Sequence, residues 1–199
     1  MSQICQLFHA AASPFVRKVR VVAHEADQAL DLIAVHATPL ATPDALLAVN
    51  PLGKIPTLRT PSGEELYDSR VICRYLGEGA GLYPPAPLLW RALRREALAD
   101  GLLEAALLAR YETILRPEER RWEDWIAGQS GKIMRALAAM ATDNANAERP
   151  DIGDIATGCA LAYLDFRYPQ IDWRSTHPGL AGFAETLFAR PSFQNTEPE

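Results

Sequence analysis

The segment Tyr83–Pro87 contains three prolines and separates two parts of the chain whose hydrophobic patterns differ. Before it, short apolar runs typical of strands alternate with amphipathic helical spacing, and after it apolar residues recur only at helical spacing. A chain of 199 residues is long enough for two small domains. We therefore predict an α/β domain over residues 1–83 and an all-α domain over residues 88–199.

The first part begins with a strand, a helix and a second strand. The run Ile4–Phe8 is rich in strand formers. Ser13 is a favoured N-cap residue and Pro14 suits the first helical position, so a helix is expected to begin there. Leu32–Val35 reads as the next strand. A strand–helix–strand unit of this length makes its two strands parallel.

A turn, a hairpin and a short helix complete the predicted α/β domain. The sequence NPLGKIP at 50–56 holds two prolines and a glycine, which favours a sharp turn into a strand at 57–59. Residues 60–64 predict a hairpin turn and 65–67 its return strand. A helix is expected to start at 68–69. Its predicted buried face consists of Val71, Ile72, Tyr75 and Leu76.

The second part is predicted to be a helical bundle. A wide apolar arc over 98–114 indicates a long helix, ended by the proline at 117. Further helices are expected around 126–141, from 151 and around 180–187. Asp151, with a second acid three residues later at Asp154, resembles a capping box, so both aspartates are assigned to structure.

Composition excludes several classes of protein. The formal net charge of −5 and the absence of a basic run argue against nucleic-acid binding. No apolar run reaches the ~20 residues of a membrane span, and the first residues lack a secretory signal pattern. Cys5, Cys73 and Cys159 lie far apart, so neither a disulfide framework nor a zinc cluster is supported. We expect a cytoplasmic protein without a metal.

Several motifs, in this order along the chain, resemble the glutathione S-transferase family. They are SPFVRKV at 13–19, NPLGKIP at 50–56, Asp68-Ser69, DIGD at 151–154 and RPSF at 190–193. The resemblance spans nearly the whole chain and is greatest to small bacterial transferases with an SPFVRK loop. It implies a thioredoxin-like N-terminal domain (βαβ-ββα), an all-helical C-terminal domain, a homodimer, and glutathione as co-substrate.

The resemblance also implies site residues. Ser13 stands at the catalytic position, where a hydroxyl at a helix N-terminus would donate a hydrogen bond to the glutathione thiolate. The glutathione-binding residues implied are Lys54, Ile55, a cis-Pro56, Asp68 and Ser69. Each has a plainer alternative: Ser13 as a helix cap only, the prolines as a turn only, Lys54 as a surface lysine and the acid–serine pair as an N-cap.

The acceptor pocket implied by the resemblance holds His9, Ala11, Arg110 and Tyr111. Trp122 is a further candidate, and Asp100 is considered as a contact to glutathione across a dimer. Simple packing or surface roles are the alternative for each. The predicted function is a glutathione transferase acting on a hydrophobic electrophile. Conjugation, peroxide reduction, dehalogenation and ether cleavage all stay open.

Two other functions stay open as alternatives. One is a glutathione-binding or regulatory protein of the same fold without transferase activity, since fold does not fix function. The other is a thiol–disulfide oxidoreductase. That chemistry needs a nucleophilic cysteine near the helix start, where this chain has serine.

Overall fold

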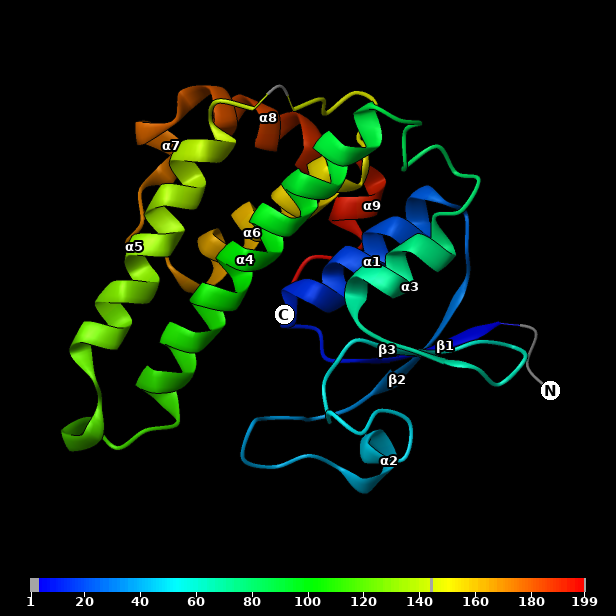
Figure 1. Ribbon diagram of the computed structural model, residues 1–199, viewed down its shortest axis with the longest axis horizontal. Coiled ribbons are helices and arrows are strands. Elements are labelled where there is room, and N and C mark those ends of the chain that lie inside the picture. Colours follow the sequence, from blue (N-terminus) through cyan, green and yellow to red (C-terminus); the bar gives the residue numbers. More distant parts are fainter. Residues whose placement is uncertain (1–3, 144, 199) are drawn as a thin grey trace. The chain divides into compact units, whose positions relative to one another are not determined.

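The computed structural model describes residues 4–143 and 145–198. Residues 1–3, which enter the expectation about a secretory signal, lie outside them. The chain forms two compact units (Figure 1). The first unit comprises Met1–Pro84 together with Ala189–Glu199, and the helical unit comprises Pro85–Phe188.

A four-stranded mixed sheet forms the centre of the first unit. Its strands are β1 (Cys5–His9), β2 (Leu30–Ala34), β3 (Thr57–Arg59) and β4 (Glu65–Leu66). The strand order is β2-β1-β3-β4. As predicted, β1 and β2 are parallel, and β3 and β4 form an antiparallel hairpin. Strand β3 also runs antiparallel to β1. The predicted α/β class of this part is confirmed.

Helices cover both faces of this sheet (Figure 1). They are α1 (Pro14–Glu25), α2 (Asp44–Leu47), α3 (Ser69–Leu76) and α9 (Pro191–Gln194). Helices α1 and α3 pack against each other, and α9 packs against α1. Neighbouring strand residues point to opposite faces, so Leu7 and Phe8 are both buried, with Phe8 packing against Leu46 and Val49 near α2.

The predicted buried face of α3 is partly wrong. Ile72 and Leu76 are buried, whereas Val71 and Tyr75 are 47% and 45% exposed. Residues four apart lie on one stripe of a helix, and 71 and 75 form the stripe beside 72 and 76. A short helix that packs on α1 buries only one of the two stripes.

Five α-helices are described in the helical unit. They are α4 (Leu88–Ile114), α5 (Glu123–Met140), α6 (Ile152–Arg167), α7 (Trp173–Thr176) and α8 (Pro178–Phe188), with a 3₁₀ turn η1 at Glu118–Arg120. The long helix α4 packs against both α5 and α6. Every residue of Ile152–Leu164 is buried, so α6 is surrounded by protein along most of its length.

The start of α6 approaches α4 closely. A Cβ atom at Gly153 would lie 2.6 Å from the carbonyl oxygen of Ala92 and 2.7 Å from the Cβ of Arg95. Only glycine leaves room for this approach.

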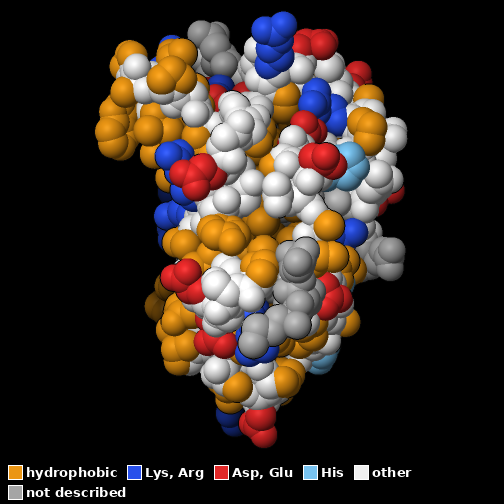
Figure 2. Space-filling model, turned by 90° about the vertical axis from the view of Figure 1, so that its right-hand side faces the viewer, with side chains coloured by type: hydrophobic (Ala, Val, Ile, Leu, Met, Phe, Trp, Pro, Cys, Tyr) orange, Lys and Arg blue, Asp and Glu red, His pale blue; other side chains and the backbone are white. Residues whose placement is uncertain are grey.

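Among the described residues, no helix is both long and apolar enough to span a bilayer. On the face drawn in Figure 2, basic side chains lie among acidic ones.

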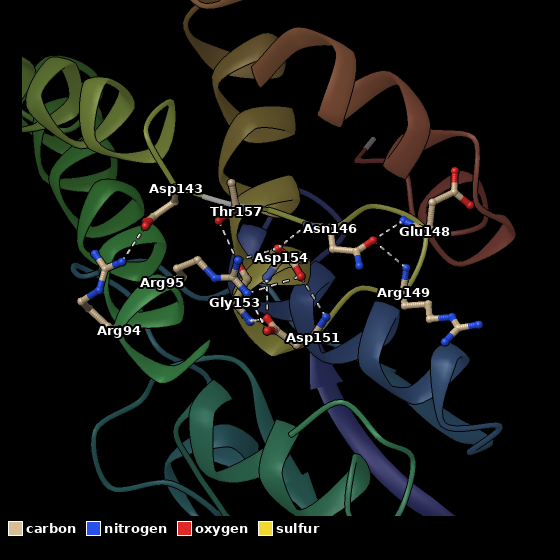
Figure 3. A network of polar contacts seen from close by, with 10 residues as sticks. All are labelled: Arg94, Arg95, Asp143, Asn146, Glu148, Arg149, Asp151, Gly153, Asp154 and Thr157. Atoms are coloured by element: carbon tan, nitrogen blue, oxygen red, sulfur yellow. Dashed lines mark hydrogen bonds and ion pairs between the residues drawn. The ribbon is translucent and has the colours of Figure 1, made fainter. Parts of the chain in front are cut away.

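The predicted capping box at the start of α6 is confirmed (Figure 3). Asp151 Oδ1 accepts hydrogen bonds from the backbone N–H groups of Gly153 at 2.8 Å and Asp154 at 3.1 Å, and Asp154 Oδ2 accepts from the Asp151 N–H at 3.0 Å. Arg95 of α4 contacts Asp151 Oδ2 at 2.5 Å and Asp154 Oδ1 at 3.1 Å. The box therefore also ties α6 to α4.

Candidate functional site

One edge of the sheet brings three predicted segments together. Phe8 in β1 pairs with Thr57 at the beginning of β3, and Leu66 at the end of β4 pairs with Leu58. Because β3 is antiparallel to both neighbours, the ends of β1 and β4 lie at the edge where β3 begins. The loop after β1, the turn before β3 and the segment leading into α3 therefore meet there.

Ser13 caps α1 and keeps its own proton available. Its Oγ accepts a hydrogen bond from the backbone N–H of Val16 at 3.3 Å, and Pro14 follows at the first helical position. A hydroxyl has one donor proton besides its acceptor lone pairs. Within the described residues, no acceptor takes the Ser13 proton. Capping and donation to a ligand are therefore compatible.

The turn before β3 is held by Asn50, whose role sequence reasoning missed. The buried Asn50 amide donates to the Lys54 carbonyl and to Thr57 Oγ1, both at 3.0 Å. The Ile55–Pro56 peptide bond is cis. Over residues 4–143 and 145–198, neither the N–H nor the C=O of Ile55 has a hydrogen-bond partner. The turn thus presents an unpaired, strand-like donor and acceptor.

The third segment is the beginning of α3. Asp68 is its N-cap and Oδ1 accepts from the Arg70 N–H at 3.0 Å. Ser69, the first helical residue, is only 3% exposed. A helix N-terminus carries partial positive charge and unpaired N–H groups, which suit a carboxylate. Asp68 is exposed, as is the side chain of Lys54 in the neighbouring turn.

Two candidate pocket residues, His9 and Ala11, lie on this side of the sheet. His9 ends β1, and its buried Nδ1 makes no hydrogen bond in the described part of the chain. Burial lowers the pKa of His9, and the charge of Arg20 lowers it further. The imidazole is therefore neutral at pH 7. Ala11 is half-buried in the loop that leads to Ser13.

The remaining candidates belong to the helical unit. Arg110 and Tyr111 lie near the end of α4 and are half-buried, while Asp100 lies buried in its middle. Trp122 is largely exposed and stacks on Trp125 with ring centroids 6.1 Å apart. Among the described residues, no group of three or more His, Cys, Asp or Glu side chains is arranged to hold a metal ion.

Comparisons with known proteins decide the family. Residues 7–84 match the profile of the glutathione S-transferase N-terminal domain, and residues 123–185 match that of the C-terminal domain. The chain belongs to the glutathione S-transferase family. Its sheet-containing unit and helical unit show the thioredoxin-like glutathione S-transferase fold.

Several glutathione S-transferase relatives are similar over their full length. An uncharacterized GST-like protein of Escherichia coli K12, YibF, is 34% identical, with 94% of this chain and 95% of the relative covered. A family member from Pseudomonas fluorescens Pf-5, solved with bound glutathione, is 46% identical with a TM-score of 0.94, covering 98% and 99% of the two chains. A Methylobacillus flagellatus transferase with glutathione bound is 39% identical with a TM-score of 0.90, covering 98% and 100%.

Proposed function

We propose that the protein is a glutathione transferase. Glutathione binds to the domain of residues 1–83, and its thiolate attacks a hydrophobic electrophile held by the domain of residues 88–199. One observation carries this proposal: three segments meet at one edge of the sheet. They are the loop after β1 with Ser13, the turn before β3 with the unpaired backbone of Ile55, and the N-terminus of α3, which follows β4. Similar family members hold glutathione.

Each part of the tripeptide has a matching group in this proposal. The N–H and C=O of Ile55 pair with the cysteinyl residue as a short antiparallel strand would. Ser69 and the α3 N-terminus bind the γ-glutamyl carboxylate, and Asp68 faces the adjacent ammonium group. Lys54 reaches the glycyl carboxylate through a charge-assisted hydrogen bond.

Ser13 donates its free proton to the glutathione sulfur and favours the thiolate. In conjugation a C–S bond forms, the leaving group departs with its bonding electrons, and the thiol proton goes to solvent. A thiol with a pKa of ~8.5 is about 3% ionised at pH 7, and lowering that pKa by roughly two units raises the ionised fraction about 25-fold. The thiolate with the lower pKa is also less nucleophilic, and this cancels a factor of about 6–10 of the gain.

The net chemical gain from Ser13 is therefore only a few-fold. A larger acceleration has to come from holding the electrophile beside the sulfur, which converts a bimolecular reaction into an effectively unimolecular one. The identity of the reaction thus depends on the acceptor side more than on Ser13.

A cytoplasmic homodimer belongs to the same proposal, and analytical ultracentrifugation tests its oligomeric part.

The test compares wild type with Ser13→Ala and Ser13→Thr. Calorimetry measures glutathione binding, ultraviolet absorbance against pH gives the pKa of the bound thiol, and an aryl chloride reports conjugation. We expect Ser13→Ala to raise the thiol pKa and slow conjugation a few-fold at pH 7, while Ser13→Thr keeps both near wild type. Conjugation by Ser13→Ala at the wild-type rate contradicts the role of Ser13, and glutathione binding without turnover of any electrophile favours a binding protein.

A further inference from the structure

Two arginines lie near the ends of α4 and α6, which pack together. Arg110 lies near the end of α4 and Arg167 is the last residue of α6. The hydroxyl of Tyr168 donates to the Ala106 carbonyl at 2.5 Å, which holds the end of α6 against the turn of α4 that precedes Arg110. Burial lowers the pKa of Arg167, and the charge of Arg110 lowers it further, as expected for neighbouring cations.

The acids nearest in sequence are already engaged elsewhere. Asp165 accepts from Trp173 Nε1 at 2.9 Å and from Arg174 at 2.6 Å. Glu112 forms an ion pair with Arg116 at 2.7 Å. Neither carboxylate is therefore committed to the two arginines.

Within residues 4–143 and 145–198, neither guanidinium forms an ion pair or hydrogen bond. The Arg167 guanidinium lies over the Phe166 ring, with its central carbon 3.7 Å from the centroid. Like charges that share a partly desolvated place repel each other unless an anion compensates them. The pair therefore favours a negatively charged ligand.

Tyr163 adds an independent observation. It lies four residues before Arg167, on the same stripe of α6, and is only 4% exposed. Its hydroxyl has no hydrogen-bond partner in the described part of the chain. Burial raises the pKa of Tyr163 to about 12, so the hydroxyl keeps its proton. The ring is buried, but the hydroxyl oxygen is not among the fully buried unpaired polar atoms, so it is open to a ligand and can donate a hydrogen bond to a bound anion.

We propose that Arg110, Arg167 and Tyr163 form an anion-binding site in the helical unit that receives a carboxylate of the acceptor substrate. Planar guanidinium groups and a phenol hydroxyl are the donors that a carboxylate matches. The description of this ligand as the acceptor rests on the proposed transferase function, whereas the binding of a carboxylate does not. The electrophile then combines an apolar body with an anionic group.

A matched pair of electrophiles tests the site. In 4-chloro-3-nitrobenzoate and 4-chloro-3-nitrobenzamide the same carbon–chlorine bond is broken, and only the first carries a charge. For each, kcat/KM is divided by the uncatalysed rate constant, which removes their difference in intrinsic reactivity. We expect wild type to prefer the benzoate, and Arg110→Gln and Arg167→Gln each to reduce that preference about tenfold or more.

Two further variants keep this comparison decisive. Arg135→Gln removes the same charge from an exposed position of α5 and should leave the preference unchanged. Tyr163→Phe removes one oxygen with minimal risk to folding and should reduce the preference several-fold. If all three site variants prefer the benzoate over the benzamide as strongly as wild type does, the proposal is overturned.

A binding measurement separates this site from the transferase proposal. Calorimetry with 3-nitrobenzoate, which has no leaving group, needs neither glutathione nor turnover. If Arg167→Gln abolishes its binding while wild type conjugates no electrophile, the anion site stands and the transferase proposal fails. If wild type conjugates both electrophiles and Arg167→Gln binds 3-nitrobenzoate as wild type does, the anion site is overturned alone.

Discussion

Glu25, the last residue of α1, fixes the end of the chain through one carboxylate. Its oxygens accept hydrogen bonds from Arg190 Nε at 2.9 Å, Arg190 Nη2 at 2.8 Å and Ser192 Oγ at 2.5 Å. Two parallel N–H donors from one guanidinium make a strong, directional pair. The hydrogen bond from Arg190 is the main reason that the pKa of Glu25 is lowered.

The sign of the resulting pH dependence follows from this lowered pKa. Stability from Glu25 is complete above its unfolded pKa of about 4.3 and is lost as pH falls through the lower folded pKa. Glu25→Gln should therefore be less stable at pH 7 and show a shallower loss of stability between about pH 5 and pH 3. Urea unfolding across this range measures it.

The control for this prediction is Glu78→Gln, which changes an exposed glutamate of the same unit. It should follow the wild-type curve. If Glu25→Gln loses stability between pH 5 and pH 3 as steeply as wild type does, the ion pair with Arg190 adds nothing to stability.

At the scale of an element, the start of α6 depends on one side chain for two tasks. Asp151 accepts the free N–H groups of the first turn and also binds Arg95 of α4. The first task belongs to the helix and the second to helix packing, so the two can be separated by substitution. Serine is an N-cap residue as good as aspartate but carries no charge.

Asp151→Ala should lower the free energy of unfolding by about 0.5–2 kcal/mol through loss of the cap alone, and by more if the contact with Arg95 contributes. Asp151→Ser should recover the capping part only. Chemical denaturation of the three proteins gives both quantities. Equal stability of wild type and Asp151→Ala would rule out the cap as a stabilising feature.

Local chemistry explains which elements were predictable. The helix start at Ser13-Pro14 and the strand at 57–59 are specified by their own residues, and the structure has both. Helix α9 has four residues and is stabilised by its contact with α1, which no periodicity reveals. Tyr163 has the spacing of a core residue, and that spacing gives no sign of whether its hydroxyl has a hydrogen-bond partner.

The candidate site was predictable to a different degree. Ser13, Ile55 and Ser69 entered through family motifs, and strand register then explains why their segments meet. The role of Asn50 depends on two hydrogen bonds across a turn, and Arg110 and Arg167 lie far apart in sequence. Such groupings depend on tertiary structure, which single-sequence patterns do not encode.

At the scale of the molecule, the chain does not divide into a first and a second half. Its last residues, Ala189–Glu199, belong to the same compact unit as its first. Phe193 is 1% exposed, and its carbonyl accepts from Arg17 Nη2 of α1 at 3.1 Å. The terminal segment is therefore part of the core of the sheet-containing unit.

Phe193→Ala should lower the free energy of unfolding by about 3–5 kcal/mol, as for a fully buried aromatic side chain. Deletion of residues 190–199 should lower it further, because the Arg190 pair is lost too. Deletion of only residues 198–199 leaves α9 intact and should have little effect. Thermal unfolding followed by circular dichroism distinguishes the three, and a stable 190–199 deletion would contradict this account.

The position of α9 also sets an order of events during synthesis. During synthesis, β1, α1 and the rest of the sheet leave the ribosome before the helical unit, whereas α9, which covers one face of α1, leaves it after that unit. The nascent first unit thus waits, with apolar surface uncovered, until the complete helical unit has been made. Domains usually fold in the order in which they emerge, whereas here the first unit is completed only after the helical unit has been made.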